Sequence, residues 1–205
     1  MLFSFNSILA VTSMVGAVAG HGIITKPWPR APGAASLAAC GPNVTNNIKG
    51  DNTSHVEDLP EAGALDPKYH ADKCNLWLCR GLQYADNKEH VVSYKAGQKV
   101  DMEVYLRIKH FGSANVSIVD TKTNKIISPN LVYWAKYADE KKATVPAEEK
   151  FSFKIPKNLG SKCATAGDCV IQRWWYGTGA KQTYESCVDF TVAAPMVMNK
   201  RFRRV

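Results

Sequence analysis

The sequence predicts an all-β protein: an antiparallel β-sandwich, immunoglobulin-like or fibronectin-like, with long loops and disulfide staples. Three observations predict it: short segments of alternating hydrophobicity between turn residues, the lack of a convincing amphipathic helix, and six cysteines. Short alternating strands with turn signals are typical of antiparallel sheets that bury one face. The chain has 205 residues, which suits one such domain.

The clearest strand spans residues 100–108, where apolar and polar side chains alternate. This period of two indicates a strand with one buried face. The stretch 26–66 is rich in Pro, Gly, Ala and Asn and predicts long loops. A short helix is expected at most at 66–73. Further strand candidates are 116–118, 125–127, 151–155, 170–176 and 184–192.

The first 20 residues predict a secretory signal peptide, because an apolar run is followed by the small residues Val18, Ala19 and Gly20. Cleavage after Gly20 would make His21 the mature N-terminus. It would leave one domain over 21–193 and a disordered basic tail over 194–205. No other segment approaches the roughly 20 apolar residues of a spanning helix. We therefore expect a secreted, extracellular monomer with no membrane association.

The formal net charge of +8 suggests a polyanion partner at first sight. Four of the positive charges, however, stand in the tail, at Lys200, Arg201, Arg203 and Arg204. The remaining chain is only mildly basic, and it has no basic cluster on a recognised nucleic-acid module. We expect no nucleic-acid partner, and a neutral substrate stays open.

Six cysteines in a chain bound for an oxidising compartment indicate disulfides rather than a zinc site. Many pairings satisfy that number of cysteines. We expect two local bridges and one long one: Cys74–Cys79, Cys163–Cys169 and Cys40–Cys187. Asn-x-Ser/Thr sequons, which permit N-glycosylation, stand at Asn43, Asn52 and Asn115.

A mature N-terminal His21 would offer a metal two nitrogen atoms, the α-amine and an imidazole nitrogen. Nitrogen-rich sites suit copper(II), and an amine of ordinary pKa, about 7.7 to 8.0, loses its proton readily to a metal. His110 is the best third nitrogen because it follows the clearest strand. The other histidines, His55, His70 and His90, stand in polar loop sequence. Each histidine taken alone is more often structural.

The segment Gln182–Cys187 supplies a third element. Side chains alternate along a strand, so Gln182 and Tyr184 would share one face. Tyr184 could then take the weak axial position of a copper centre, and Gln182 could donate a hydrogen bond to a bound oxygen species. The alternative is an ordinary half-buried tyrosine beside a solvated glutamine.

These residues resemble those of lytic polysaccharide monooxygenases, most closely auxiliary-activity family sixteen. The resemblance covers nearly all of residues 21–192. Two departures are Trp28, where a smaller residue is expected, and Arg173, which interrupts a tryptophan-rich strand. The segments that carry the resemblance are His21–Ile24, Arg30–Ala35, Cys74–Cys79, Ala114–Ser117 and Gln182–Cys187.

The resemblance implies a site with one copper ion. His21 and His110 match its histidine ligands, Tyr184 its axial tyrosine, and Gln182 a neighbouring glutamine. Cys187 matches a cysteine bridged to an early loop, which supports Cys40 as its partner. A further histidine that the family places near the copper without binding it has no match in residues 174–181, so proton delivery to the oxygen species is unassigned.

The resemblance also implies an external electron donor and either hydrogen peroxide or dioxygen as co-substrate. The expected reaction removes a hydrogen beside the glycosidic oxygen, so that the hydroxylated chain breaks. We expect cellulose or another β-1,4-glucan as substrate, oxidised at the anomeric carbon. Aromatic candidates for sugar stacking are Trp28, Tyr69 and Tyr94.

Three other functions compete with this reading. A non-catalytic secreted copper-binding protein of the same fold is the main alternative. A carbohydrate-binding module or a host-directed effector, either without redox chemistry, would make His21 dispensable. A hydrolase is disfavoured, because the carboxylate pair Glu57 and Glu61 has no supporting motif.

Overall fold

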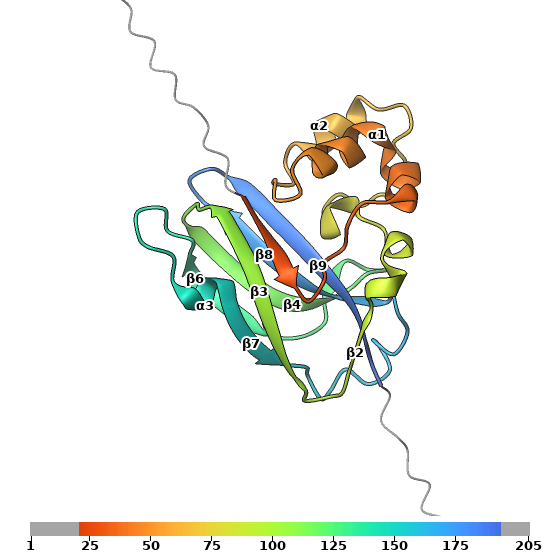
Figure 1. Ribbon diagram of the computed structural model, residues 1–205. Helices are drawn as coiled ribbons and strands as arrows, with labels where there is room; N and C mark the ends of the chain where they lie inside the picture. Colours follow the sequence, from red (N-terminus) through yellow and green to blue (C-terminus); the bar gives the residue numbers. More distant parts are fainter. Residues whose placement is uncertain (1–20, 194–205) are drawn as a thin grey trace, which may run out of the picture.

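The computed structural model describes residues 21–193, which form two packed β-sheets with α1 and α2 on one side (Figure 1). The predicted signal peptide at 1–20 and basic tail at 194–205 lie outside the described residues. Within 21–193, no helix is both long and apolar enough to cross a membrane. The predicted β-sandwich is confirmed.

The smaller sheet has three antiparallel strands in the order β1-β3-β7. They are β1 (His21–Lys26), β3 (Lys99–Ile108) and β7 (Lys150–Lys154). The larger sheet has the order β2-β9-β8-β4-β5, and β6 also pairs with β4. Its strands are β2 (Val92–Tyr94), β4 (Gly112–Asp120), β5 (Lys125–Ile126), β6 (Val132–Tyr137), β8 (Cys169–Gly177) and β9 (Gln182–Val192). One pair, β2 with β9, is parallel.

The main core lies between the sheets and follows from the alternation in the sequence. Every second side chain of β3 is buried, and these side chains face buried residues of β4, β8 and β9. Burying one such aliphatic or aromatic side chain contributes about 1.5 to 3 kcal/mol. The core includes Val100, Met102, Val104, Leu106, Val116, Ile118, Ile171, Trp175, Tyr184, Val188 and Phe190.

Residues 27–91, between β1 and β2, form the excursion, which stands beside the sandwich and contains most of the helix (Figure 1). The prediction of long loops over 26–66 was wrong, because this stretch contains the longest helix of the excursion, α1. The expected helix at 66–73 is a series of turns. Gly41 (φ +74°) and Pro42 kink α1 in its middle, so no long amphipathic pattern marks it. The helices are α1 (Ala34–Gly50), α2 (Leu59–Ala64), the single-turn η1 (Cys79–Gly81), η2 (Tyr84–Asp86) and η3 (Lys88–His90), and, outside the excursion, α3 (Pro146–Glu149).

The start of α1 is capped by a residue from a distant part of the chain. The Asp86 carboxylate accepts hydrogen bonds from the backbone N–H groups of Gly33, Ala35 and Ser36, and from the Ser36 hydroxyl. A carboxylate satisfies the unpaired N–H groups of a helix start and complements its dipole. Burial acts to raise the pKa of Asp86, but these hydrogen bonds outweigh burial and hold the pKa below its ordinary value.

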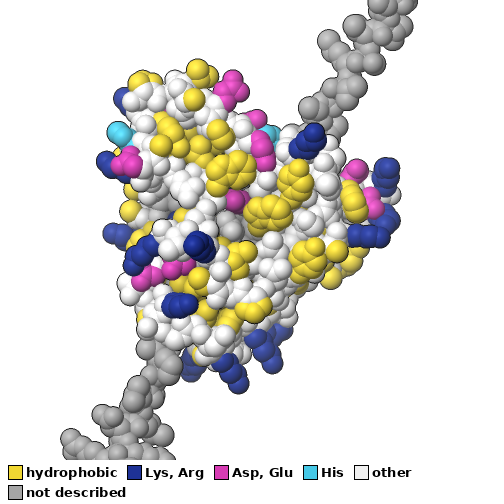
Figure 2. Space-filling model, turned by 180° about the vertical axis from the view of Figure 1, so that it is seen from behind, with side chains coloured by type: hydrophobic (Ala, Val, Ile, Leu, Met, Phe, Trp, Pro, Cys, Tyr) yellow, Lys and Arg dark blue, Asp and Glu magenta, His cyan; other side chains and the backbone are white. Residues whose placement is uncertain are grey.

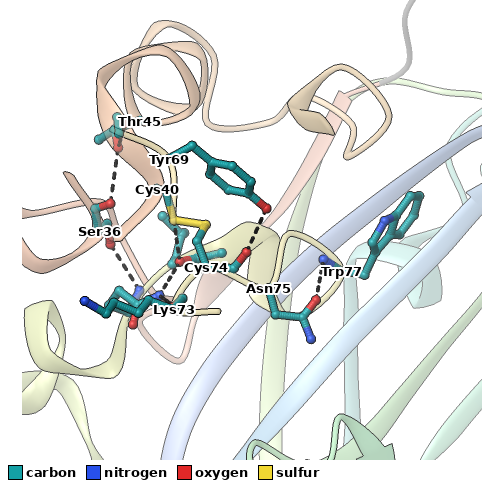
Figure 3. Close-up of a disulfide and its surroundings, with 12 residues drawn as sticks. Ser36, Cys40, Thr45, Tyr69, Lys73, Cys74, Asn75 and Trp77 are labelled. Carbon is teal, nitrogen blue, oxygen red and sulfur yellow. Dashed lines mark hydrogen bonds between the residues drawn. A yellow bond between two sulfur atoms is a disulfide. The ribbon is translucent and has the colours of Figure 1, made fainter. Parts of the chain in front are cut away.

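Two of the three predicted disulfides were wrong. The bridges are Cys40–Cys74, Cys79–Cys187 and Cys163–Cys169, so neither Cys74–Cys79 nor Cys40–Cys187 forms. The physical reason is a turn: Cys79, Arg80 and Gly81 all have positive φ. This turn directs Cys79 to β9, while Cys74 meets Cys40 of α1 (Figure 3).

Candidate metal centre

His110 lies in the tight connection between β3 and β4. Gly177, at the end of β8, lies directly against it, because a Cβ atom on Gly177 would come within 2.9 Å of the His110 Cβ. Among the described residues, the buried Nε2 atom of His110 has no hydrogen-bond partner. Leaving a buried nitrogen unpaired is costly. An unsatisfied imidazole nitrogen is what a metal ligand would show.

Tyr184 and Gln182 lie on one face of β9, as predicted. The Tyr184 hydroxyl donates a hydrogen bond of 2.6 Å to Gln182 Oε1. The Tyr184 ring is fully buried and stacks on Trp175, with 4.2 Å between ring centroids. Gln182 pairs with Gly177, the residue that packs against His110. Strand register therefore brings Gln182 and His110 to the same end of the sandwich.

His21 begins β1 at that same end. It pairs with Ile108, two residues before His110. Its strand also crosses β9, since the Ile24 N–H donates to Ser186 Oγ at 3.3 Å. All four predicted site residues thus lie at one end of the molecule.

The departure at Arg173 has a structural explanation. Arg173 is fully buried on β8, and its guanidinium lies 5.3 Å from the Trp175 ring centroid and 5.4 Å from that of Tyr137. Its Nη2 donates to the Tyr137 hydroxyl at 3.2 Å. Cation–π contacts offset part of the cost of burying the charge. Arg173 thus belongs to the packing around Trp175, on which Tyr184 stacks.

Two residues of the excursion that the sequence did not single out contact the site. His21 Nε2 lies 2.7 Å from the Asp51 carboxylate. His55, predicted to be a loop residue, is 7% exposed and meets the Tyr184 ring edge-on at 6.2 Å. His70 and His90 are exposed, as polar loop sequence predicts. No sequence pattern marks Asp51. It stands directly after α1, a helix that the sequence did not predict.

A buried arginine, Arg80, lies next to a buried glutamate, Glu185 of β9. The backbone N–H of Arg80 donates to Glu185 Oε2 at 3.3 Å, and both side chains are nearly inaccessible to solvent. Burial raises the pKa of Glu185 to about 7, and burial lowers the pKa of Arg80 to about 10. Both residues line a mostly apolar cavity of about 260 Å³.

The donor atoms fit copper. In residues 21–193, no group of three or more His, Cys, Asp or Glu side chains could hold a metal ion. Two imidazoles alone make a poor site, so the α-amine of a mature His21 would have to complete the nitrogen set. Three nitrogens with a tyrosine nearby suit copper(II) better than zinc or calcium.

The aromatic residues predicted to stack on sugars have different surroundings. Tyr94 is buried against Phe190, so its prediction was wrong. Tyr69 is half-buried, and its hydroxyl donates to the Cys74 carbonyl at 3.1 Å. Trp28 is 60% exposed and stacks on His90. Phe111, next to His110, is 40% exposed and was not predicted.

Hydrophobic side chains also gather on the side of the molecule seen in Figure 2. An open cleft of about 410 Å³ lies over the larger sheet, with Asn115, Trp77, Trp174 and Ile126 among its lining residues.

The predicted glycosylation sites differ in exposure: Asn43 and Asn52 are exposed, and Asn115 is half-buried on β4.

A family model described as "Lytic polysaccharide mono-oxygenase, cellulose-degrading" matches residues 21–190. Comparison with curated proteins found no match. The family and its copper cofactor agree with the prediction. The expected placement in auxiliary-activity family sixteen is not supported, and the findings name family ten instead.

Solved structures of lytic polysaccharide monooxygenases are also similar. One is the cellulose-active CelS2 with copper, at 13% identity and TM-score 0.45, covering 85% of this chain and 100% of that one. Another, from Jonesia denitrificans, has 11% identity, TM-score 0.38 and coverage of 84% and 100%. A third, from Streptomyces lividans, has 13% identity and TM-score 0.36, covering 49% of this chain and only 58% of that one.

Proposed function

Because the chain belongs to the family of lytic polysaccharide mono-oxygenases, copper-dependent enzymes that act on polysaccharides, we propose that it cleaves a β-1,4-glucan by oxidation at the anomeric carbon. Cellulose or cello-oligosaccharides are the proposed substrates. The observation that carries the proposal is the buried, unpartnered His110 Nε2 at the end of the sandwich where His21, Gln182 and Tyr184 also lie.

The proposal requires secretion and cleavage after Gly20, which would expose the α-amine of His21. Its α-amine and imidazole, with His110 Nε2, would hold one copper ion, and Tyr184 would be a further ligand. Bound copper supplies one-electron redox chemistry with an external electron donor and hydrogen peroxide or dioxygen. We also propose that the protein acts as a monomer and is glycosylated at its sequons.

The protein's own residues would prepare the site. The hydrogen bond from Tyr184 to Gln182 fixes the orientation of the glutamine carboxamide, which could donate a hydrogen bond to an oxygen-containing reactant. Stacking on Trp175 keeps the Tyr184 ring in place. Phe111, exposed beside His110, offers an apolar surface on which a sugar ring could rest.

The test uses protein that begins at His21, loaded with copper, and incubated with cellulose and a reductant. Mass spectrometry should find oligosaccharides oxidised at the anomeric carbon. His110→Ala should abolish them, and so should one extra residue ahead of His21, because acylation removes the amine as a ligand. Products oxidised only at the other end would overturn the regiochemistry.

The same experiment separates the main alternative. Tight copper binding without oxidised products on any β-glucan would support a non-catalytic copper-binding protein. Absence of copper binding by the mature protein would overturn both functions.

A further inference from the structure

We infer that Asp51 is a positioning residue for His21, one that selects which imidazole nitrogen faces the metal. The inference rests on the proposed function. Asp51 Oδ2 lies 2.7 Å from His21 Nε2, a strong hydrogen-bond distance. Both side chains are largely shielded, with side-chain exposures of 13% for His21 and 27% for Asp51.

The choice of nitrogen matters because of chelation. The α-amine and Nδ1 of one histidine can close a small ring around a single ion, whereas Nε2 lies on the far side of the imidazole. A neutral imidazole has one N–H and one bare nitrogen, and a partner at one nitrogen fixes the other. With Nε2–H donating to Asp51, Nδ1 keeps its lone pair for the metal. Carboxylates commonly orient metal-bound histidines in this way.

Asp51 is itself held on several sides. It follows α1 directly, and its N–H donates to the Asn47 carbonyl at 3.2 Å. Its Oδ1 accepts the Thr53 N–H at 2.8 Å, and Arg107 Nη1 donates to its Oδ2 at 3.1 Å. The Thr53 carbonyl in turn accepts the Gly22 N–H at 3.1 Å. The segment is thus hydrogen-bonded to the strand that carries His21.

Arg80 fixes the segment 51–54 from beneath. Its guanidinium donates to the Asn52 carbonyl at 2.7 Å and to Ser54 Oγ at 2.6 Å. Arg80 is 3% exposed and is anchored beside Glu185 of β9. Arg80 therefore holds the Asp51 carboxylate in a fixed position relative to the sandwich. A surface loop without such an anchor would not do so.

The first measurement needs no metal. In mature apo-protein, at a pH where the imidazole is neutral, nitrogen-15 NMR should show His21 protonated at Nε2. Asp51→Ala should give a mixture of tautomers. Asp101→Asn on β3, an exposed aspartate paired with Lys99, is the matched control and should leave the tautomer unchanged. Protonation at Nδ1 in the unaltered protein would overturn the inference.

The second measurement is copper affinity by calorimetry, with electron paramagnetic resonance of the copper(II) protein. Asp51→Ala should weaken binding about 10- to 100-fold and alter the spectrum, while Asp101→Asn changes neither. Equal affinity and an identical spectrum in Asp51→Ala would overturn the inference. If the unaltered mature protein bound no copper, the proposed function would fail instead, and the NMR result would still judge the tautomer. Apo-protein melting curves show whether Asp51→Ala is folded, and Asp51→Asn replaces it if not.

Discussion

The sandwich and the excursion are stabilised by different forces. The two sheets enclose a continuous apolar core in which Ile118, Trp175 and Val188 are wholly inaccessible. The excursion has a smaller cluster around Val44 and Leu59. It depends on two disulfides and on side chains that hydrogen-bond to backbone groups, such as Asp86 at the start of α1 and Arg80 beneath residues 51–54.

The difference shows how the site is divided between the two regions. His110 and Tyr184 are positioned by strand register and packing in the sandwich. His21 belongs to β1 of the sandwich but has its carboxylate partner in the excursion. Variants in one region should therefore disturb one half of the site and leave the other half largely intact.

The largest effect should come from cutting the link between the regions. Replacing Cys79 and Cys187 by alanine removes a bridge across 108 residues. The unfolding free energy should fall by about 5 kcal/mol, because the unfolded chain gains the entropy of a long open loop. The same change at Cys163 and Cys169, separated by 6 residues, should cost about 2 kcal/mol. Chemical denaturation measures both. Equal losses would show that loop length does not determine the contribution.

Gly177→Ala tests the sandwich half of the site. The new Cβ would lie 2.9 Å from the His110 Cβ and force the histidine aside. Copper affinity should fall on the order of tenfold, the scale of lost support for a metal ligand. Gly179→Ala, where a Cβ meets nothing within 4 Å, is the control for calorimetry. Unchanged affinity in Gly177→Ala would argue against His110 as a ligand.

Asp86→Asn tests the excursion and adds a pH dependence. Loss of the charged cap should cost about 1 kcal/mol of unfolding free energy at neutral pH. The folded-state pKa of Asp86 lies below its ordinary value of 3.8, so its contribution is present above that value and is lost as the pH falls through the folded-state pKa. The advantage of the unaltered protein over Asp86→Asn should therefore shrink below about pH 4. A constant gap in denaturation experiments from pH 7 to roughly pH 3 would contradict this.

The smallest effect is expected from removing a single tyrosine hydroxyl, tested once in each region. Tyr184→Phe removes the hydrogen bond to Gln182 but keeps the stacking on Trp175, so it should cost about 1 kcal/mol. Tyr69→Phe removes the hydrogen bond to the Cys74 carbonyl and should cost no more. Only Tyr184→Phe should change the copper(II) resonance spectrum. Identical spectra would remove Tyr184 from the site.

Local patterns in the sequence predicted the strands of the sandwich well. The alternation along β3 marks its buried face, and Gln182 and Tyr184 share a strand face because they are two residues apart. His110 followed from the end of that same strand. These inferences depend only on strand periodicity, which neighbouring residues determine.

The excursion half could not be predicted in this way. The Gly41–Pro42 kink divides α1 into pieces too short for a clear helical period. Cys74 and Cys79 form disulfides with different partners because of a turn with three successive residues of positive φ. Two of these three residues are not glycine. Asp51 meets His21 only because α1 ends where it does. Such contacts depend on the path of the chain, which no short motif encodes.

The position of β9 has a consequence for biosynthesis. This last strand carries Gln182, Tyr184 and Cys187, while the first strand carries His21. A growing chain from which β9 has not yet emerged lacks Tyr184 and the partner of Cys79. We therefore expect the complete proposed site to form only after β9 has joined the sandwich. A nascent chain would offer a copper ion only the nitrogens of His21 until His110 and Tyr184 had emerged and folded.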